Sequence, residues 1–187
     1  PEGFKIMTLA NTSPETVITR PDKFVKATLY TGTGANQRIE TGMKPDLIWI
    51  KSRNQTTWHN LTDSVRGLNK SLFPNDEDKE TTETDIILST DSTGFTLGAD
   101  GNSDGTNVNT KTYVAWTWKA GGNAGTWNKD DVSYASAADV GLTGITSPAT
   151  LVGASIGTKQ GFSIIRWNRG ADHPSWSTGV IPHGLTQ

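Results

Sequence analysis

Six carboxylates gather in residues 75–85, and paired carboxylates are the groups that glycoside hydrolysis requires. They are Asp76, Glu77, Asp78, Glu80, Glu83 and Asp85. A glycosidase holds two such groups at a fixed separation in a cleft, where the environment raises the pKa of the acid. A flexible polar loop does not provide that environment. The sequence therefore favours a solvated acidic loop over a hydrolase site.

A serine in a G-x-S-x-G pattern is the second candidate for chemistry. Gly153–Gly157 matches the pattern and places Ser155 at the nucleophile position. A nucleophile elbow needs a buried strand before the serine and a helix after it. The residues that follow, Thr158–Gly161, show no helical pattern. We therefore do not expect Ser155 to act as a nucleophile.

A third pattern resembles part of a calcium loop. Asp100–Gly105 matches the first half, D-x-[DN]-x-[DN]-G, but position twelve holds Lys111 where a bidentate glutamate is expected. Residues rich in Gly, Asn and Asp favour a turn between two strands. A cation site of another kind, using Asp100 and Asp104, is the alternative.

Other metal ligands are sparse. The chain has no cysteine, and His59, His173 and His183 do not share the spacing of a metal site. We therefore assign no catalytic, cofactor-binding or metal-binding residue, and we expect no cofactor. The chain is predicted not to be an enzyme.

One charged pair has a structural interpretation. Asp63 and Arg66 are three residues apart, near Trp58 and His59. A carboxylate and a guanidinium at this spacing can form a hydrogen-bonded clamp that organises a loop. We assign the pair to that role.

The bulk composition sets limits on partners. The chain has 187 residues, 33% hydrophobic residues, 20 glycines and a net charge of -2. The small negative charge gives no reason to expect binding to nucleic acid, and no apolar run approaches the length that crosses a bilayer. We therefore predict no nucleic-acid partner and no membrane insertion. The seven tryptophans suit either a small core or a surface that stacks on sugars.

The elements that would position these residues are strands. Residues 25–30 and 113–119 alternate, and the second run places Val114, Trp116 and Trp118 on one face. Residues 47–50 form a continuous apolar run, and residues 86–88 and 94–97 flank a turn. Residues 63–72 also permit one or two helical turns. Together these patterns predict an all-β chain with one complete module at residues 23–122.

The remaining segments surround that module. Residues 1–22 are polar and contain Pro14 and Pro21, which predicts an extended N-terminal arm. Residues 123–160 are rich in small residues and are interpreted as a linker or loop. The run at 162–168 resembles the run at 25–31, so residues 161–187 are predicted to begin a second, truncated copy. The chain is then a piece of a longer protein.

Several segments, taken in order, resemble a module that recurs in tandem in marine bacteriophages, especially cyanophages and pelagiphages. The matching segments are Ala27–Gly34, Lys44–Lys51, Asp63–Gly67, Thr82–Thr84, Asp91–Gly98 and Thr112–Gly122. Residues 141–165 are similar to the usual entry into a following copy. The second copy departs from the pattern at Arg166–Gly170, where a Tyr-Thr-Gly type of turn is usual.

The resemblance implies a fold and a role. The implied fold is a jelly-roll-like antiparallel β-sandwich with an N-terminal extended arm and a partial second β module. The implied function is a bacteriophage virion structural protein, in the virion-proximal part of a tail fibre or appendage used for host attachment. Expected partners are other virion proteins through the arm, further copies in a homotrimer, and a host surface glycan or receptor. A head fibre or capsid decoration protein and a lectin-like module are the alternatives.

Overall fold

The computed structural model describes residues 20–100, 105–122, 125–145, 149–168 and 180–185. Most of the predicted arm at residues 1–22 lies outside the described residues, as do His173 and residues 101–104 of the calcium-type pattern. Pro21–Lys23 form a single 3-10 turn, which is the one helical element in the described ranges. All other regular structure there is β.

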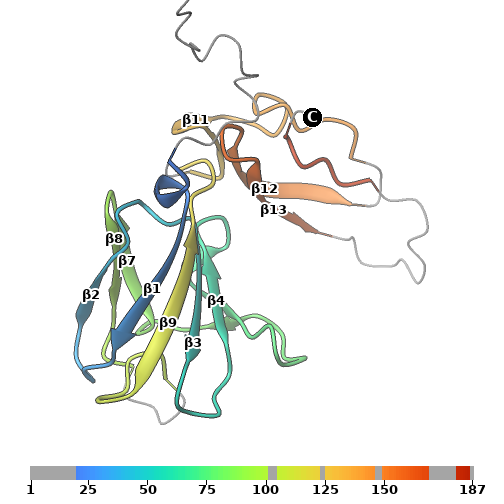
Figure 1. The fold of residues 1–187 in the computed structure, drawn as a ribbon. Coiled ribbons are helices and arrows are strands. Elements are labelled where there is room, and N and C mark those ends of the chain that lie inside the picture. The colour runs from blue at the N-terminus through green and yellow to red at the C-terminus, as the bar shows by residue number, and fades with distance from the viewer. Residues whose placement is uncertain (1–19, 101–104, 123–124, 146–148, 169–179, 186–187) are drawn as a thin grey trace, which may run out of the picture.

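The first half of the chain forms a two-layered sandwich, which we define as residues 20–122 (Figure 1). One layer has six antiparallel strands in the order β1-β9-β3-β4-β5-β6. Their bounds are β1 Val25–Thr31, β3 Leu47–Ser52, β4 Asn60–Asp63, β5 Gly67–Leu72, β6 Thr81–Thr82 and β9 Thr112–Trp118. The second layer has the order β2-β8-β7, with β2 Gln37–Glu40, β7 Ile87–Asp91 and β8 Gly94–Leu97.

The core of the sandwich lies between these two layers. Its buried members are Ile39, Ile48, Ile50, Ile86, Ile87, Phe95, Leu97, Tyr113 and Ala115. Alternation along each strand sends every second side chain inward, which is why the apolar runs of the sequence supply this core. The ring of Tyr113 stacks on Tyr30 with 5.1 Å between ring centroids. The predicted all-β sandwich is therefore confirmed.

The predicted helical turns at residues 63–72 are wrong. The chain instead reverses between β4 and β5, which pair as an antiparallel hairpin. Asp63 accepts hydrogen bonds from the backbone N–H groups of Val65 and Arg66, and Gly67 adopts a φ of 110°. A positive φ suits glycine and ends any helix, so the local residues specify a turn rather than a helix.

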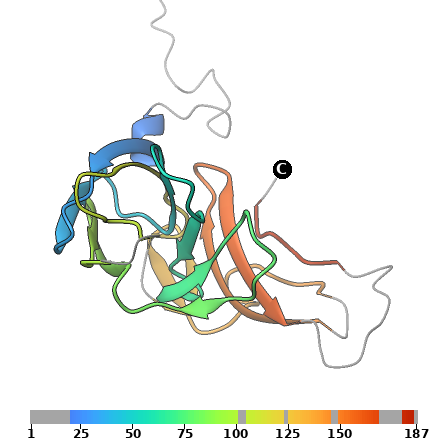
Figure 2. The ribbon, with the colours of Figure 1, turned by 90° about the horizontal axis from the view of Figure 1, so that it is seen from below.

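The second half of the chain forms a separate sheet, which we call the second sheet. Its strands are β10 Trp127–Lys129, β11 Val132–Tyr134, β12 Thr150–Gly157 and β13 Phe162–Asn168, in the order β11-β10-β12-β13. β10 and β12 pair in parallel, and the other pairs are antiparallel. Figure 2 shows this sheet beside the sandwich.

The interpretation of residues 123–160 as a linker or loop is wrong, because three of these strands lie within that segment. β12 is built largely from small side chains, and residues 153–157 are all buried. Small residues allow close packing but give little periodic signal in a sequence. β13 is a strand as predicted, but it pairs with β12. A boundary at residue 161 would therefore cut through the turn of a hairpin.

Candidate binding face

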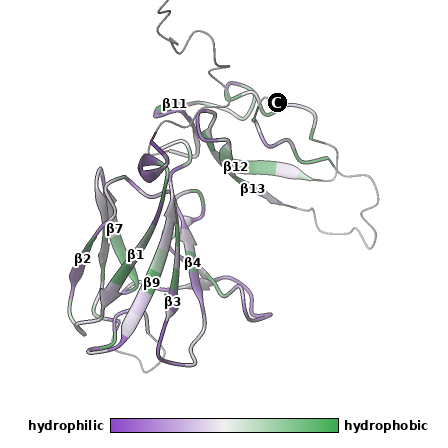
Figure 3. Ribbon diagram, in the orientation of Figure 1, coloured by the Kyte–Doolittle hydropathy of each residue, from purple (hydrophilic) through white to green (hydrophobic). Residues whose placement is uncertain are grey.

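The six-stranded sheet is apolar on its outer side as well as on its core side. Since Ile48, Ile50, Tyr113 and Ala115 point into the core, their neighbours along β3 and β9 point outward. We call the outer surface the aromatic face. Its apolar side chains are Val25, Ala27, Leu29, Leu47, Trp49, Leu61, Leu72, Val114, Trp116 and Trp118. Figure 3 colours parts of β1, β9 and β3 as hydrophobic.

Rings cross the centre of this face in a row. Trp116 on β9 lies directly opposite Trp49 on β3, with 5.6 Å between ring centroids and 58° between the planes. The ring of His59 lies 5.8 Å from Trp49 on the other side. The tilt means that the rings interlock through their edges instead of forming one flat platform.

His59 fixes the orientation of Trp49. The indole Nε1–H of Trp49 donates to Nδ1 of His59 over 3.2 Å, which requires that nitrogen to be unprotonated. Burial, followed by the nearby charge of Lys51, lowers the pKa of His59. Both effects keep the imidazole neutral, and so preserve the acceptor that the indole needs.

The second sheet covers one part of the aromatic face. Phe162 at the start of β13 stacks on Trp118, with 6.3 Å between ring centroids. A groove of about 430 Å³ separates β13 from Leu47, Leu61 and Leu72. The part of the face formed by β1 stays open, with Leu29 62% exposed and Val25 42% exposed. Contiguous exposed apolar surface is typical of interaction sites, so this open part is the candidate binding face.

A buried carboxylate that the sequence analysis did not single out, Asp46, fixes the sandwich side of the junction with the second sheet. Asp46 is 1% exposed, and its Oδ2 accepts hydrogen bonds from the backbone N–H groups of Ala120 at 2.7 Å and Gly122 at 2.9 Å. Its Oδ1 accepts from the hydroxyl of Ser64. Burial raises the pKa of Asp46, and these donors oppose that rise. The carboxylate thereby holds the chain where it leaves β9.

Ser155 of the G-x-S-x-G pattern is a second part of this junction. Its side chain is fully buried in β12, where the hydroxyl donates to Oδ1 of Asn128 at 2.7 Å and accepts from the N–H of Gly121 at 2.8 Å. The residue lies within a strand, and the turn at 158–161 follows it. Ser155 therefore binds the two sheets together and is not presented to a substrate.

The predicted clamp between Asp63 and Arg66 is confirmed. Nε of Arg66 lies 2.5 Å from Oδ2 of Asp63, and Nη2 of Arg66 donates to the carbonyl of Leu61 at 3.0 Å. Glu80 lies 3.4 Å from the same guanidinium. The clamp holds the β4–β5 turn beside the groove under β13. Its role is to shape the edge of the aromatic face.

The remaining candidates are dispersed. Asp100 accepts hydrogen bonds from the N–H and the hydroxyl of Thr106, and burial raises its pKa. Of the acidic stretch, only Glu80 lies in an ion pair within the described ranges. His183 is exposed and accepts a hydrogen bond from the N–H of Leu185. No group of three or more potential metal ligands occurs among the described residues.

Comparison with known proteins gives one family. A family model described as a domain of unknown function, DUF7483, matches residues 20–186. No curated protein and no solved structure matches the chain. Within the described residues, no helix is long and apolar enough to cross a membrane.

Proposed function

The chain belongs to the DUF7483 family, and we propose that it is a structural module of a bacteriophage virion, in the virion-proximal part of a tail fibre or similar appendage. Two observations support the proposal. The sequence resembles modules that recur in tandem in such proteins, and the fold is an all-β sandwich joined to a second sheet. Neither feature supplies a catalytic arrangement, which fits a role in assembly and attachment.

The aromatic face is the observation that carries the proposed assembly of the chain. Sheets with apolar residues on both sides are ordinarily covered on both sides. The second sheet covers only the part near Trp118, and the part near Leu29 is open. In the proposed assembly, further copies of the chain cover this open part, giving a homotrimer. In this proposal the N-terminal arm, residues 1–22, docks on other virion proteins, and a host glycan or receptor is the target.

A pair of matched variants tests the assembly. Leu29 on β1 is 62% exposed on the aromatic face, and Leu88 on β7 is 42% exposed in the opposite layer. We expect light scattering to find a trimer for the unaltered chain and for Leu88→Arg, but a monomer for Leu29→Arg. A charge buried in an apolar interface without a partner is costly. A monomeric unaltered chain, or a Leu29→Arg trimer, would contradict the proposed interface.

The place in the particle has its own test. Antibodies against the chain, labelled with gold, are expected to mark the tail or its fibres on purified virions. Labelling of the head would replace the proposal with the head-fibre or capsid-decoration alternative. Virions that carry no label, and no peptides of the chain by mass spectrometry, would overturn the virion role altogether.

The aromatic face also favours a second candidate, a lectin-like module. Trp49 and Trp116 are only partly buried, and indole rings can stack on sugar rings. A glycan array probed with the intact chain would support this candidate if the binding were lost in Trp116→Ala. Absence of binding to every glycan would exclude it.

A further inference from the structure

We propose that a second site, a lysine-lined cleft between the sandwich and the second sheet, binds a small anionic saccharide bearing carboxylate or sulfate groups. The cleft has a volume of about 510 Å³, within the range of sites for small organic ligands. We call it the lysine cleft, after Lys23, Lys44, Lys119 and Lys159 in its wall. It lies apart from the aromatic face, and the proposal does not rest on the virion role.

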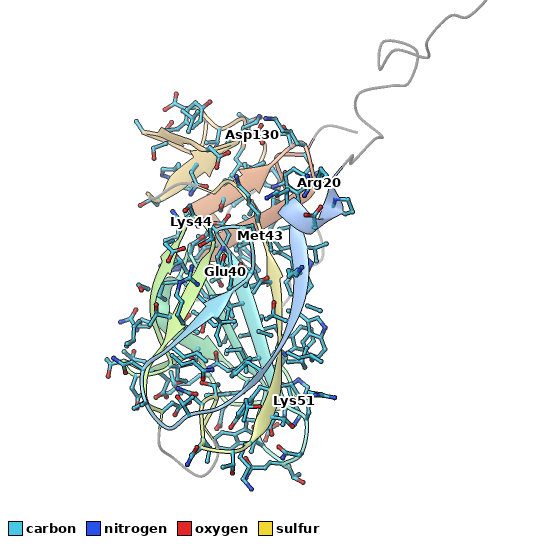
Figure 4. The ribbon with its side chains drawn as sticks, turned by 60° about the vertical axis from the view of Figure 1, so that its left-hand side comes forward. Arg20, Glu40, Met43, Lys44, Lys51 and Asp130 are labelled. Carbon is cyan, nitrogen blue, oxygen red and sulfur yellow. The ribbon has the colours of Figure 1, made fainter. Side chains whose placement is uncertain are left out.

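Six separate parts of the chain meet at the lysine cleft, one of them the β7–β8 turn with Ser92. Lys23 belongs to the 3-10 turn, Lys44 follows β2, Lys119 follows β9, and Lys159 lies in the β12–β13 turn. The hairpin between β10 and β11 adds two aspartates. In Figure 4, Met43 and Lys44 at the end of the sandwich lie below the hairpin that carries Asp130. The site exists only because the two sheets pack together.

Both aspartates of the cleft already have partners in this structure. Asp131 forms an ion pair with Lys119, with 2.8 Å between the charged atoms. Asp130 accepts hydrogen bonds from the N–H of Thr158 at 2.9 Å and from the hydroxyl of Thr158 at 2.5 Å. These contacts tie the β10–β11 hairpin to the neighbouring turns. They leave three lysines of the wall without a carboxylate of their own.

These three lysines, Lys23, Lys44 and Lys159, form no ion pair with any residue in the described part of the chain. With four lysines and two aspartates, the wall has an excess of two positive charges. Like charges around a shared cavity repel each other, and a cavity of one sign concentrates ions of the other. An anion in the cleft relieves that repulsion, so the site selects negatively charged ligands.

The uncharged lining indicates a saccharide. Phe24 supplies apolar surface for the C–H face of a sugar. Ser92 supplies a hydroxyl, and Gln160 supplies its Oε1 as an acceptor, because its Nε2 already donates to the carbonyls of Lys119 and Ala120. Phe24 is the only aromatic ring among the described lining residues, and none of them is arginine. A nucleobase prefers stacking between rings, and planar recognition of phosphate favours arginine. The lining therefore fits an acidic sugar better than a nucleotide.

Calorimetry with the full chain tests the site. The probes are a sulfated heparin disaccharide, digalacturonate, and cellobiose as a neutral sugar of the same length. We expect the two anionic disaccharides to bind, cellobiose to bind far more weakly, and the affinity for the anionic probes to fall as salt is added. Heat from cellobiose equal to that from the charged probes would overturn the role of the lysines.

Variants locate the binding in the cleft. The triple variant Lys23→Met, Lys44→Met, Lys159→Met removes the three unpaired charges and keeps the side-chain length. We expect it to weaken binding about tenfold or more, because each lost ammonium removes part of the attraction. Lys79→Met, at an exposed lysine of the acidic loop, is the matched control and should bind normally.

Three further outcomes would overturn the proposal. The first is no binding of either anionic disaccharide by the unaltered chain at low salt. The second is unchanged binding by the triple variant when circular dichroism shows that it is folded. The third is binding of inorganic sulfate as tight as that of the sulfated disaccharide, which would mean an ion site without sugar recognition. If the triple variant fails to fold, Lys159→Met alone, in an exposed turn, replaces it.

Discussion

The sandwich and the second sheet differ in the size of their buried apolar cores. The sandwich encloses nine buried apolar side chains between two layers. Among the described residues, the core cluster of the second sheet has four buried members, which are Val140, Leu142, Ala154 and Ile156. The sandwich has the two packed layers that ordinarily make a domain. The second sheet is a single layer. Its apolar side chains therefore need other parts of the chain to shield them from water.

Part of that shielding comes from the sandwich. Phe162 rests on Trp118, and Gln160 donates to the backbone carbonyls of Lys119 and Ala120 at 3.0 and 2.8 Å. Leu185, close to the end of the chain, packs against the core of the second sheet. The second sheet therefore depends on these contacts with the sandwich for part of its stability. At the junction, the apolar contact between Phe162 and Trp118 and the hydrogen bonds of Gln160 both hold the second sheet against the sandwich.

Separating the two parts should have the largest effect. A chain cut after Gly122 keeps all nine strands of the sandwich and is expected to unfold cooperatively on heating. Residues 123–187 alone lack the contacts with the sandwich, and they bury too little apolar surface for a stable core. We expect that fragment to show no near-ultraviolet circular dichroism. A folded 123–187 fragment would show that the second sheet is independent.

Removing a large side chain from the sandwich core comes next. Phe95 on β8 is fully buried. We expect Phe95→Ala to lower the free energy of unfolding by about 3–5 kcal/mol, since it removes packed surface and leaves a cavity. Chemical denaturation provides the measurement. Leu88→Ala, on the exposed side of β7, is the control and should change stability little.

Breaking the junction should cost somewhat less. Asp46→Ala removes the acceptor for the N–H groups of Ala120 and Gly122, which remain buried or half-buried. We expect a loss of about 2–4 kcal/mol, because an unpaired buried donor retains its full desolvation cost. Two separate transitions in denaturant would show that the sheets have become uncoupled. Asp22→Ala, at an exposed carboxylate, is the control.

Deleting one methylene from each core compares the two regions directly. Ile48 in the sandwich and Ile156 in the second sheet are almost completely buried. We expect Ile48→Val and Ile156→Val each to lower stability by about 0.5–1.5 kcal/mol. If the two parts unfold together, both variants shift the same transition. If Ile156→Val shifts a separate, earlier transition, the second sheet is the weaker part.

The smallest effect concerns His59. Its pKa is lowered in the folded chain, so the unfolded chain takes up a proton first as the pH falls. The stability that the neutral imidazole provides is therefore complete above the usual histidine pKa and declines as the pH drops through and below it. We expect denaturation midpoints at pH 7.5 and 5.5 to differ less in His59→Gln than in the unaltered chain. An equal difference would remove the role of the Trp49 hydrogen bond.

Much of the sandwich could be predicted because its signals are local. Alternation in residues 113–119 and the apolar run at 47–50 specify strands without reference to the rest of the chain. The clamp between Asp63 and Arg66 was predictable for the same reason, since its partners are three residues apart. The strands of residues 123–160 were missed because β10 and β11 are only three residues long and β12 is built largely from small side chains, so none of the three gives a clear periodic signal.

The sequence by itself determined that the chain is β-rich and that Val114, Trp116 and Trp118 share a face. Only the tertiary structure decided that this face points outward, because an alternating strand can bury either side until a second layer chooses one. Asp46 reaches the N–H groups of Ala120 and Gly122 across more than seventy residues of sequence. The lysine cleft likewise joins distant turns. Such contacts depend on how the sheets pack, and no local pattern encodes them.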